Sequence, residues 1–349
     1  MNQDKLHQLV GQAVSELGAA VMGATVIVGD KLGLYKALAS GGPMTAQQLA
    51  EKTGTAERYV REWLSTQAAS GYVGYDAATK TFSMSPEQQA ILSDENSPFF
   101  LAGGFYGLES IYGNEPRLTD AFTSGRGLGW GEQTSCLFCG TERFFGPGYK
   151  ANLVTNWLPA LEGVVEKLRK GANVADVGCG HGVSTIVMAE AFPESRFVGF
   201  DFHEPSIRRA RQLASEAGLK NVSFEVATAK DFGGEKYDLV ACFDCLHDMG
   251  DPAGAASHIR EMLKPDGTWM IVEPMAGDSL EENLNPVGRI YYAFSTTVCV
   301  PTSLDQEVGT ALGAQAGEKR LREVATQGGF NRFRRATETP FNMVLEARP

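Results

Sequence analysis

The segment 176–182, Asp-Val-Gly-Cys-Gly-His-Gly, has a residue order that suits the binding of a nucleoside ligand. It follows a short apolar run and precedes a helical stretch that begins near Val183. Three glycines permit a tight turn and a close approach of the backbone to a ligand, and the first amides of a helix carry partial positive charge. A second apolar run ends at Asp201, 23 residues after Gly178. A carboxylate there can accept hydrogen bonds from both hydroxyls of a ribose, so the sequence predicts a nucleoside site.

His247 is the residue whose type and place best suit proton transfer. It follows the apolar run 237–243, at the edge of the expected sheet where ligands of such folds lie. An imidazole with a pKa near neutrality can take a proton from a phenol, an enol or a thiol. Two other interpretations stay open, because His247 could instead contact a cofactor or cap the following turn through Asp248. Asp244 and Asp248 are alternative cofactor contacts.

The elements that must position these residues form an alternating pattern from Ala172 onward. Helical stretches separate short apolar runs of the kind that buried parallel strands give, at 173–178, 196–201, 222–226, 237–244 and 268–274. The alternation predicts a doubly wound α/β domain. Residues 329–349 offer two further strands about a turn at Thr339 and Pro340, so we expect the sheet to finish with an antiparallel hairpin.

The N-terminal part predicts a different, mainly helical domain. Residues 12–40 are apolar on more than one helical face, and a partner chain could cover the second face. Two short helices follow, which we expect Thr45 and Thr55 to cap, and residues 71–84 suggest a small β-hairpin. This is the outline of a winged helix. Residues 1–90 nevertheless contain seven Lys or Arg and eight Asp or Glu, so the charge disfavours DNA binding.

The segment between the two domains is rich in glycine and aromatic residues. Residues 93–150 could line a substrate pocket or simply pack between domains, with helices expected around 108–124 and 149–170. A second candidate lining segment is 275–304, which contains Cys299. Arg143, Tyr149 and Arg289 could recognise an anionic acceptor. The pair Cys136 and Cys139 has no second cysteine pair to complete a zinc site, so we predict packing for it and assign no metal ligand.

Composition limits the possible classes of protein. The 349 residues include 31 Lys or Arg and 42 Asp or Glu, which gives a formal charge of −11, and 43% are hydrophobic. The chain is therefore expected to bury cores in about two domains and has no general attraction to nucleic acid or anionic membranes. The N-terminus lacks the pattern of a signal peptide, and no uninterrupted apolar run approaches the ~20 residues of a membrane span. Six cysteines in a chain of this size predict reduced thiols and a cytoplasmic protein.

The glycine spacing separates two kinds of nucleoside cofactor. A dinucleotide-binding turn follows G-x-G-x-x-G, whereas here the third glycine arrives one residue early, at Gly182. The segment 176–182 instead resembles motif I of class I S-adenosylmethionine-dependent methyltransferases, acidic-x-G-x-G-x-G. Asp201 matches that family's ribose-binding acid, the sequence LKPDG at 263–267 matches its turn before strand five, and the final hairpin matches its reversed seventh strand. The resemblance implies S-adenosylmethionine as the cofactor.

Together with a winged-helix-like domain, the order Leu246-His247-Asp248 resembles the small-molecule O-methyltransferases. In those enzymes the matching histidine is the general base, and an acid at the end of strand five, here Glu273, orients it. The family's adenine-binding loop corresponds to 227–231. We assign to the donor Asp176, Gly178, Cys179, Gly180, Gly182, Asp201, Phe202, Thr228, Ala229, Lys230, Phe243, Asp244 and Asp248.

We therefore expect three regions: a winged-helix-like dimerisation domain at 1–95, an aromatic connector at 96–165, and a Rossmann-like methyltransferase domain of seven strands at 166–349. The expected activity is methyl transfer to a small hydroxyl or thiol acceptor by a homodimer. A thiol acceptor would need less help from a base, because thiols already ionise in part near neutral pH. The whole chain also resembles a bacterial group described either as methyltransferases or as transcriptional regulators, so a donor-sensing DNA-binding regulator is the alternative from another class.

Overall fold

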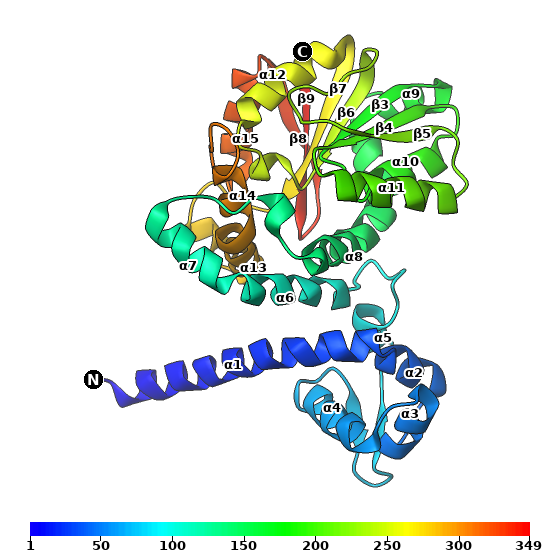
Figure 1. Ribbon diagram of the computed structural model, residues 1–349, viewed down its shortest axis with the longest axis vertical. Coiled ribbons are helices and arrows are strands. Elements are labelled where there is room, and N and C mark those ends of the chain that lie inside the picture. Colours follow the sequence, from blue (N-terminus) through cyan, green and yellow to red (C-terminus); the bar gives the residue numbers. More distant parts are fainter. The chain divides into compact units, whose positions relative to one another are not determined.

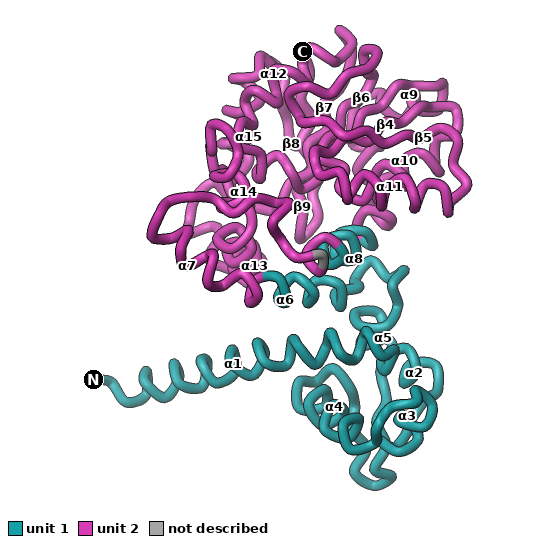
Figure 2. Tube along the Cα trace, in the orientation of Figure 1, with its two compact units in different colours: residues 1–110, 139–147 teal, residues 111–138, 148–349 magenta. Residues whose placement is uncertain are grey.

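The computed structural model describes the chain from Met1 to Pro349 apart from the side chain of Ser135. The chain divides into two compact units (Figure 2): residues 1–110 with 139–147, and residues 111–138 with 148–349. The smaller unit is mainly helical, and the larger one contains the main β-sheet.

The smaller unit has the winged-helix outline that the sequence predicted. Helices α3 and α4 form the helix-turn-helix, and the antiparallel strands β1 and β2 form the wing (Figure 1). An isolated antiparallel β-bridge joins Met44, which lies between α2 and α3, to Phe82 of β2. The elements are α1 (Gln3–Lys31), α2 (Leu34–Gly41), α3 (Ala46–Thr53), α4 (Glu57–Ala69), β1 (Gly74–Asp76), β2 (Thr81–Ser83) and α5 (Pro86–Leu92).

Helix caps confirm one local prediction and contradict another. Thr45 caps α3 in a reciprocal capping box with Gln48, as its residue type suggested. Thr55 does not cap α4, because that helix starts one residue later, with Ala56 at the N-cap position. The Thr55 hydroxyl instead shares a hydrogen bond of 2.8 Å with the hydroxyl of Thr53. The Thr55 side chain thus bonds to a neighbouring side chain and not to the first amides of α4.

Helix α1 leaves much of its apolar surface uncovered. Its exposed apolar side chains recur on one face, at Leu6, Leu9, Val10, Val14, Leu17 and Val21. By length and composition alone this helix could also cross a membrane. In its most apolar 18-residue stretch, 22% is buried inside the protein. A single helix of this kind is weak support for a membrane span, because a helix that pairs with another protein surface has the same composition.

The connecting region is more broken than the two helices expected for it. Its elements are η1 (Ala102–Phe105), α6 (Tyr106–Gly113), α7 (Glu115–Ser124), η2 (Trp130–Glu132), α8 (Ser135–Asn152), the π-turn η3 (Leu153–Trp157), η4 (Leu158–Ala160) and α9 (Val164–Lys170). Pro116 lies in the first turn of α7 and Pro159 lies in η4, at the two breaks. Proline lacks an amide hydrogen and restricts the preceding residue, which explains why helices restart there.

The larger unit is a seven-stranded sheet in the order β5-β4-β3-β6-β7-β9-β8. The first five strands in this order run parallel, and β9 is antiparallel to both of its neighbours. The seven-stranded fold with a reversed last strand is thus confirmed. The strands are β3 (Asn173–Val177), β4 (Arg196–Asp201), β5 (Val222–Val226), β6 (Tyr237–Phe243), β7 (Leu263–Pro274), β8 (Arg332–Glu338) and β9 (Asn342–Arg348). Strand β7 begins five residues earlier than the apolar run at 268, because the LKPDG segment joins it.

Helices cover both faces of this sheet (Figure 1). Ile207 and Ala210 of α11 pack with Phe224 in one cluster, whereas Ile259 of α12 and Leu321 of α15 belong to another. The strand order reverses between β3 and β6, which is where ligands of such sheets bind. The remaining elements of the unit are α10 (Val183–Ala191), α11 (Glu204–Glu216), η5 (Leu246–Asp248), α12 (Pro252–Met262), η6 (Glu281–Asn283), α13 (Pro286–Phe294), the π-turn η7 (Ser295–Cys299), α14 (Val300–Leu304) and α15 (Gly317–Gln327).

Candidate active site

The glycine turn between β3 and α10 has two different reasons for its glycines. Gly178, Gly180 and Gly182 all have positive φ, at 76°, 53° and 75°. A Cβ on Gly182 would lie 2.5 Å from the ring of Phe224, so this glycine allows the turn to pack on β5. A Cβ on Gly180 would meet no described atom within 4 Å. The backbone at Gly180 therefore borders open space into which a ligand can come close.

Asp176 braces this turn from below. The hydroxyls of Ser184 and Thr185, in the first turn of α10, each donate to its Oδ2 at 2.6 Å. Burial raises the pKa of the Asp176 carboxyl to about 6, although the two hydroxyls oppose the shift. Its Oδ1 is buried and has no hydrogen-bond partner among the described residues. Asp176 was predicted to bind the methyl donor. One of its oxygens supports the turn, and the other has no hydrogen-bond partner among the described residues. Cys179, also assigned to the donor, is buried in the turn against the α11 cluster.

Asp201 joins the end of β4 to the glycine turn. Its Oδ2 accepts the amide of Gly180 at 2.9 Å, and its Oδ1 accepts the amide of His203 at 2.8 Å. Burial raises the pKa of this carboxyl, and the two amides oppose that shift. Phe202, the next residue, is half exposed. A fixed carboxylate beside an open glycine backbone suits the ribose of a nucleoside ligand, so the residues present fit the cofactor that the sequence implied.

In the loop after β5, two of the residues predicted to contact the adenine, Thr228 and Lys230, interact with other residues of the protein. The amide and hydroxyl of Thr228 donate to Oδ1 of Asp231 at 2.7 and 2.8 Å. The ammonium of Lys230 lies 2.9 Å from Asp251 and also pairs with Glu307. The charge of Lys230 is therefore balanced by protein carboxylates, and Thr228 closes a turn with Asp231.

Asp244 follows β6 with a positive φ of 49°. Its two carboxylate oxygens accept the hydroxyl of Tyr149 at 2.7 Å and the amide of Asn342 at 2.8 Å. Burial raises the pKa of Asp244 to about 7, and the nearby charge of Glu273 adds to that effect. The ring of Phe243 stacks near that of Tyr149, with centroids 5.4 Å apart. Both oxygens of Asp244 thus accept hydrogen bonds from the protein, and the hydroxyl of Tyr149, a candidate for recognising the acceptor, donates to Asp244.

His247 and Glu273 meet at the carboxyl ends of β6 and β7. The Nδ1 atom of His247 lies 2.5 Å from Oε2 of Glu273, and the amide of Leu246 donates to Oε1 at 2.9 Å. Both side chains are buried, with exposed fractions of 4% for His247 and 1% for Glu273. The sequence predicted this pairing. Since Glu273 holds Nδ1, Nε2 is the ring nitrogen left for a further contact.

The side of the ring that carries Nε2 is bordered by Asp248, whose Oδ1 lies 3.2 Å from it. Burial lowers the pKa of His247, but the carboxylates of Glu273 and Asp248 outweigh burial and raise that pKa well above its usual value. The two carboxylates therefore stabilise the imidazolium that forms when the ring takes up a proton. The structure also brings Cys299 of η7 to this point, which the sequence had only suggested as pocket lining.

The structure also describes two other features that the sequence singled out. Cys136 and Cys139, near the start of α8, form no disulfide and belong to no cluster of metal-ligating groups found among the described residues. Arg143 is held by Asp30 at 2.5 and 3.0 Å and by Glu95 at 3.1 Å. It therefore has charged partners already and is a poor candidate for recognising an anionic acceptor.

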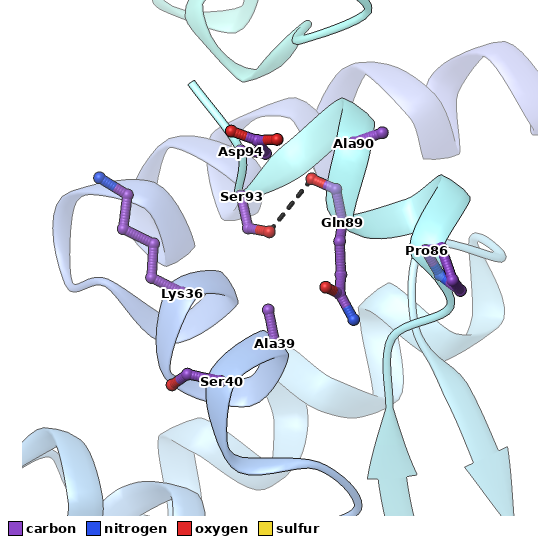
Figure 3. A pocket seen from close by; sticks show the side chains of 8 residues that line it. All are labelled: Lys36, Ala39, Ser40, Pro86, Gln89, Ala90, Ser93 and Asp94. Carbon is purple, nitrogen blue, oxygen red and sulfur yellow. Dashed lines mark hydrogen bonds between the residues drawn. The ribbon is translucent and has the colours of Figure 1, made fainter. Parts of the chain in front are cut away.

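A surface hollow of about 480 Å³ lies in the smaller unit (Figure 3). Lys36 and Ser40 of α2 face Gln89 and Asp94 across it, and the hydroxyl of Ser93 donates to the carbonyl of Gln89 at 3.1 Å. No residue predicted to bind the donor or to act in catalysis lines this hollow.

Helix α4, the second helix of the helix-turn-helix, has little free positive charge. Arg58 pairs with Glu62 at 2.6 Å, and Arg61 pairs with Glu57 at 2.8 Å. Each arginine of this helix is thus balanced by a glutamate one turn away, which weakens any attraction to phosphates.

Comparison with known proteins finds a matching family model for each of two parts of the chain. Residues 168–328 match the family model of a methyltransferase domain, and residues 20–94 match that of an Rv2258c-like winged HTH domain. The chain is 30% identical over 154 residues to a ubiquinone biosynthesis O-methyltransferase of Leptothrix cholodnii, covering 43% of this chain and 63% of that protein. It spans less than two thirds of the length of such curated relatives.

Solved structures share the fold over almost the whole chain. A putative O-methyltransferase from Nostoc punctiforme superposes with a TM-score of 0.71 at 19% identity, covering 97% of this chain and 98% of that one. Human N-acetylserotonin methyltransferase in complex with SAM gives a TM-score of 0.71 at 16% identity, covering 98% and 97%. At these identities the likeness shows the fold.

Proposed function

Since the chain carries a class I methyltransferase domain behind a winged HTH domain, we propose that it transfers a methyl group from S-adenosylmethionine to the hydroxyl of a small molecule. When bound, S-adenosylmethionine supplies an electrophilic methyl group on its sulfonium sulfur. The observation that carries the proposal is the buried Glu273–His247 pair, at the edge of the sheet where ligands of such folds lie.

The chain's own residues divide the work. Gly180 leaves room for the donor beside the turn, and Asp201, fixed by two amides, would accept hydrogen bonds from its ribose. Asp176, with one buried oxygen unpartnered, holds the turn in place and retains capacity for a further hydrogen bond. These residues bind and orient the donor and take no part in proton transfer.

His247 would take the proton of the acceptor hydroxyl at Nε2. Glu273 accepts a hydrogen bond from Nδ1–H, which fixes the ring and its tautomer and stabilises the imidazolium that forms. A positioned base of this kind contributes about 10²- to 10⁴-fold in rate. A thiol acceptor is the alternative within the same chemistry, and it would depend less on His247 because thiols ionise more readily than phenols.

The smaller unit would serve dimerisation rather than DNA binding. The uncovered apolar face of α1 is the surface that we propose pairs with a second copy of the chain. The paired arginines of α4 support this choice over a DNA-binding regulator. The six cysteines, none of them in a disulfide, support a cytoplasmic location, since reduced thiols persist there.

The test is release of S-adenosylhomocysteine by the purified protein across a panel of phenols, carboxylates, amines, sulfide and small thiols. Turnover on phenols or other hydroxyl compounds, and not on thiols, is the expected result. Turnover confined to thiols would replace the acceptor class and remove the need for a strong base. Tight donor binding with turnover on no class would favour the regulator, which a gel-shift series at low salt would then examine.

A further inference from the structure

A group of three side chains near His247 has the composition of a metal site. Asp248 follows His247 in η5, and Cys299 ends the π-turn η7, 51 residues further along the chain. One ligand atom from each, a ring nitrogen, a carboxylate oxygen and a thiol sulfur, lies within 4.8 Å of the other two. His247 and Cys299 are buried, and Asp248 is half-buried. The larger unit therefore brings three different donor types to one point.

Two further observations point to a cation at this place. The Oδ1 atom of Asp248 is buried and lies 3.2 Å from Nε2 of His247, and the Cys299 thiol interacts with both side chains, so the three donor groups already converge. Glu273 binds the opposite ring nitrogen, Nδ1, at 2.5 Å. A carboxylate on the far nitrogen is the usual outer support of a histidine that ligates a metal, because it fixes the ring and increases its basicity.

The donor set indicates which metal would bind. Imidazole nitrogen, carboxylate oxygen and thiolate sulfur are the ligands of zinc in proteins, and magnesium or calcium would avoid the thiolate. Three protein ligands with a fourth position left open are typical of zinc sites that are not purely structural.

We propose that Nε2 of His247, the carboxylate of Asp248 and the thiolate of Cys299 together bind a divalent cation of the zinc class. Binding forms the metal–sulfur bond and releases the thiol proton to solvent. The cation takes the lone pair of Nε2, which the proposed function needs for the acceptor proton. Occupancy of the site and base catalysis therefore exclude each other, so zinc inhibits methyl transfer to hydroxyl acceptors. The binding itself does not depend on the proposed function.

Cobalt(II) reports on the site directly, because a thiolate–cobalt bond absorbs in the near ultraviolet. Purified full-length protein is stripped with a chelator and titrated with cobalt(II). We expect one equivalent to produce the thiolate band and zinc(II) to remove it by competition. Cys299→Ser should lose the band, whereas Cys139→Ser, which changes an exposed cysteine, should keep it. Glu273→Gln should keep the band and weaken zinc binding about 10- to 100-fold.

Thermal melts without metal establish that each variant is folded. If Cys299→Ser does not fold, His247→Asn replaces it, and loss of the zinc affinity is expected there too. A thiolate band that survives in the folded Cys299→Ser or His247→Asn variant would overturn the proposal. Absence of stoichiometric cobalt binding by the wild-type protein would overturn it as well. Zinc inhibition that a chelator reverses, and that Cys299→Ser reduces, would support the link to Nε2. If no acceptor is turned over, the binding titration still decides the site, so failure of the two proposals can be told apart.

Discussion

Two glycines of the donor turn should respond differently to the same added methyl group. Gly180→Ala and Gly182→Ala both place alanine at positive φ, which costs about 1–2 kcal/mol. The Cβ that Gly182→Ala adds would also lie 2.5 Å from the ring of Phe224 and 3.0 Å from Ala210, which adds about 1–3 kcal/mol of overpacking. We therefore expect a loss of about 2–5 kcal/mol for Gly182→Ala and about 1–2 kcal/mol for Gly180→Ala.

Donor affinity, unlike stability, should respond specifically to the change at Gly180. The methyl of Gly180→Ala points into space free of described atoms, where we expect the donor, so it should weaken binding of S-adenosylhomocysteine at least about tenfold. Gly218→Ala is the matched control, because Gly218 has a φ of 70° and equally open surroundings at the end of α11. Its melting temperature should fall as that of Gly180→Ala does, with unchanged affinity.

The assays are thermal unfolding followed by circular dichroism and calorimetric titration with S-adenosylhomocysteine. A loss of 1 kcal/mol corresponds to about 2–4 °C in a domain of this size. Wild-type affinity in Gly180→Ala would refute the placement of the donor beside this turn. Equal melting temperatures for Gly180→Ala and Gly182→Ala would refute the packing role of Gly182.

Three further predictions concern the ribose contact, the Asp244 carboxyl and the apolar face of α1. Asp201→Asn should weaken donor binding at least about tenfold and leave kcat at saturating donor nearly unchanged, which calorimetry and initial rates can separate. In the folded chain the Asp244 carboxyl has a pKa of about 7, against an ordinary value of 3.8. The unfolded chain releases this proton at the lower pH, so the free energy of unfolding falls as pH rises from about 4 to 7, by up to about 4 kcal/mol. Asp244→Asn should remove that fall in urea unfolding across this range, and an identical pH dependence in the variant would contradict the assignment. Leu17→Glu should convert a dimer to a monomer in light scattering with helix content unchanged, while Gln8→Glu, on the polar side of α1, should remain dimeric.

The sheet was predictable because its residues are constrained by burial alone. Strands such as β3 and β6 are covered on both faces, so their sequences are continuous apolar runs whatever the neighbouring side chains are. The turn at 176–182 was equally readable, because positive φ and close packing both select glycine. Glu273 was found through the resemblance to the small-molecule O-methyltransferases, in which an acid at the end of strand five orients the histidine.

The remaining site contacts join residues far apart in sequence. Asp244 receives hydrogen bonds from Tyr149 and Asn342, which are 95 and 98 residues away. Lys230 was predicted to contact the donor, but its pairing with Glu307 depends on how the loop after α14 folds back. A pattern within a short stretch of sequence cannot reveal contacts between residues so far apart along the chain. Cys299 reached the vicinity of His247 through the π-turn η7, which a period of 3.6 residues does not reveal.

His247→Asn, measured for turnover and donor affinity on the same preparation, separates base catalysis by His247 from donor binding. Asparagine keeps an amide donor for Glu273 but cannot accept a proton as a base. With the best hydroxyl acceptor from the panel, kcat should fall about 100-fold or more while the affinity for S-adenosylhomocysteine changes less than about threefold. Turnover equal to that of the wild-type enzyme, or an equal loss of donor affinity, would contradict base catalysis by His247.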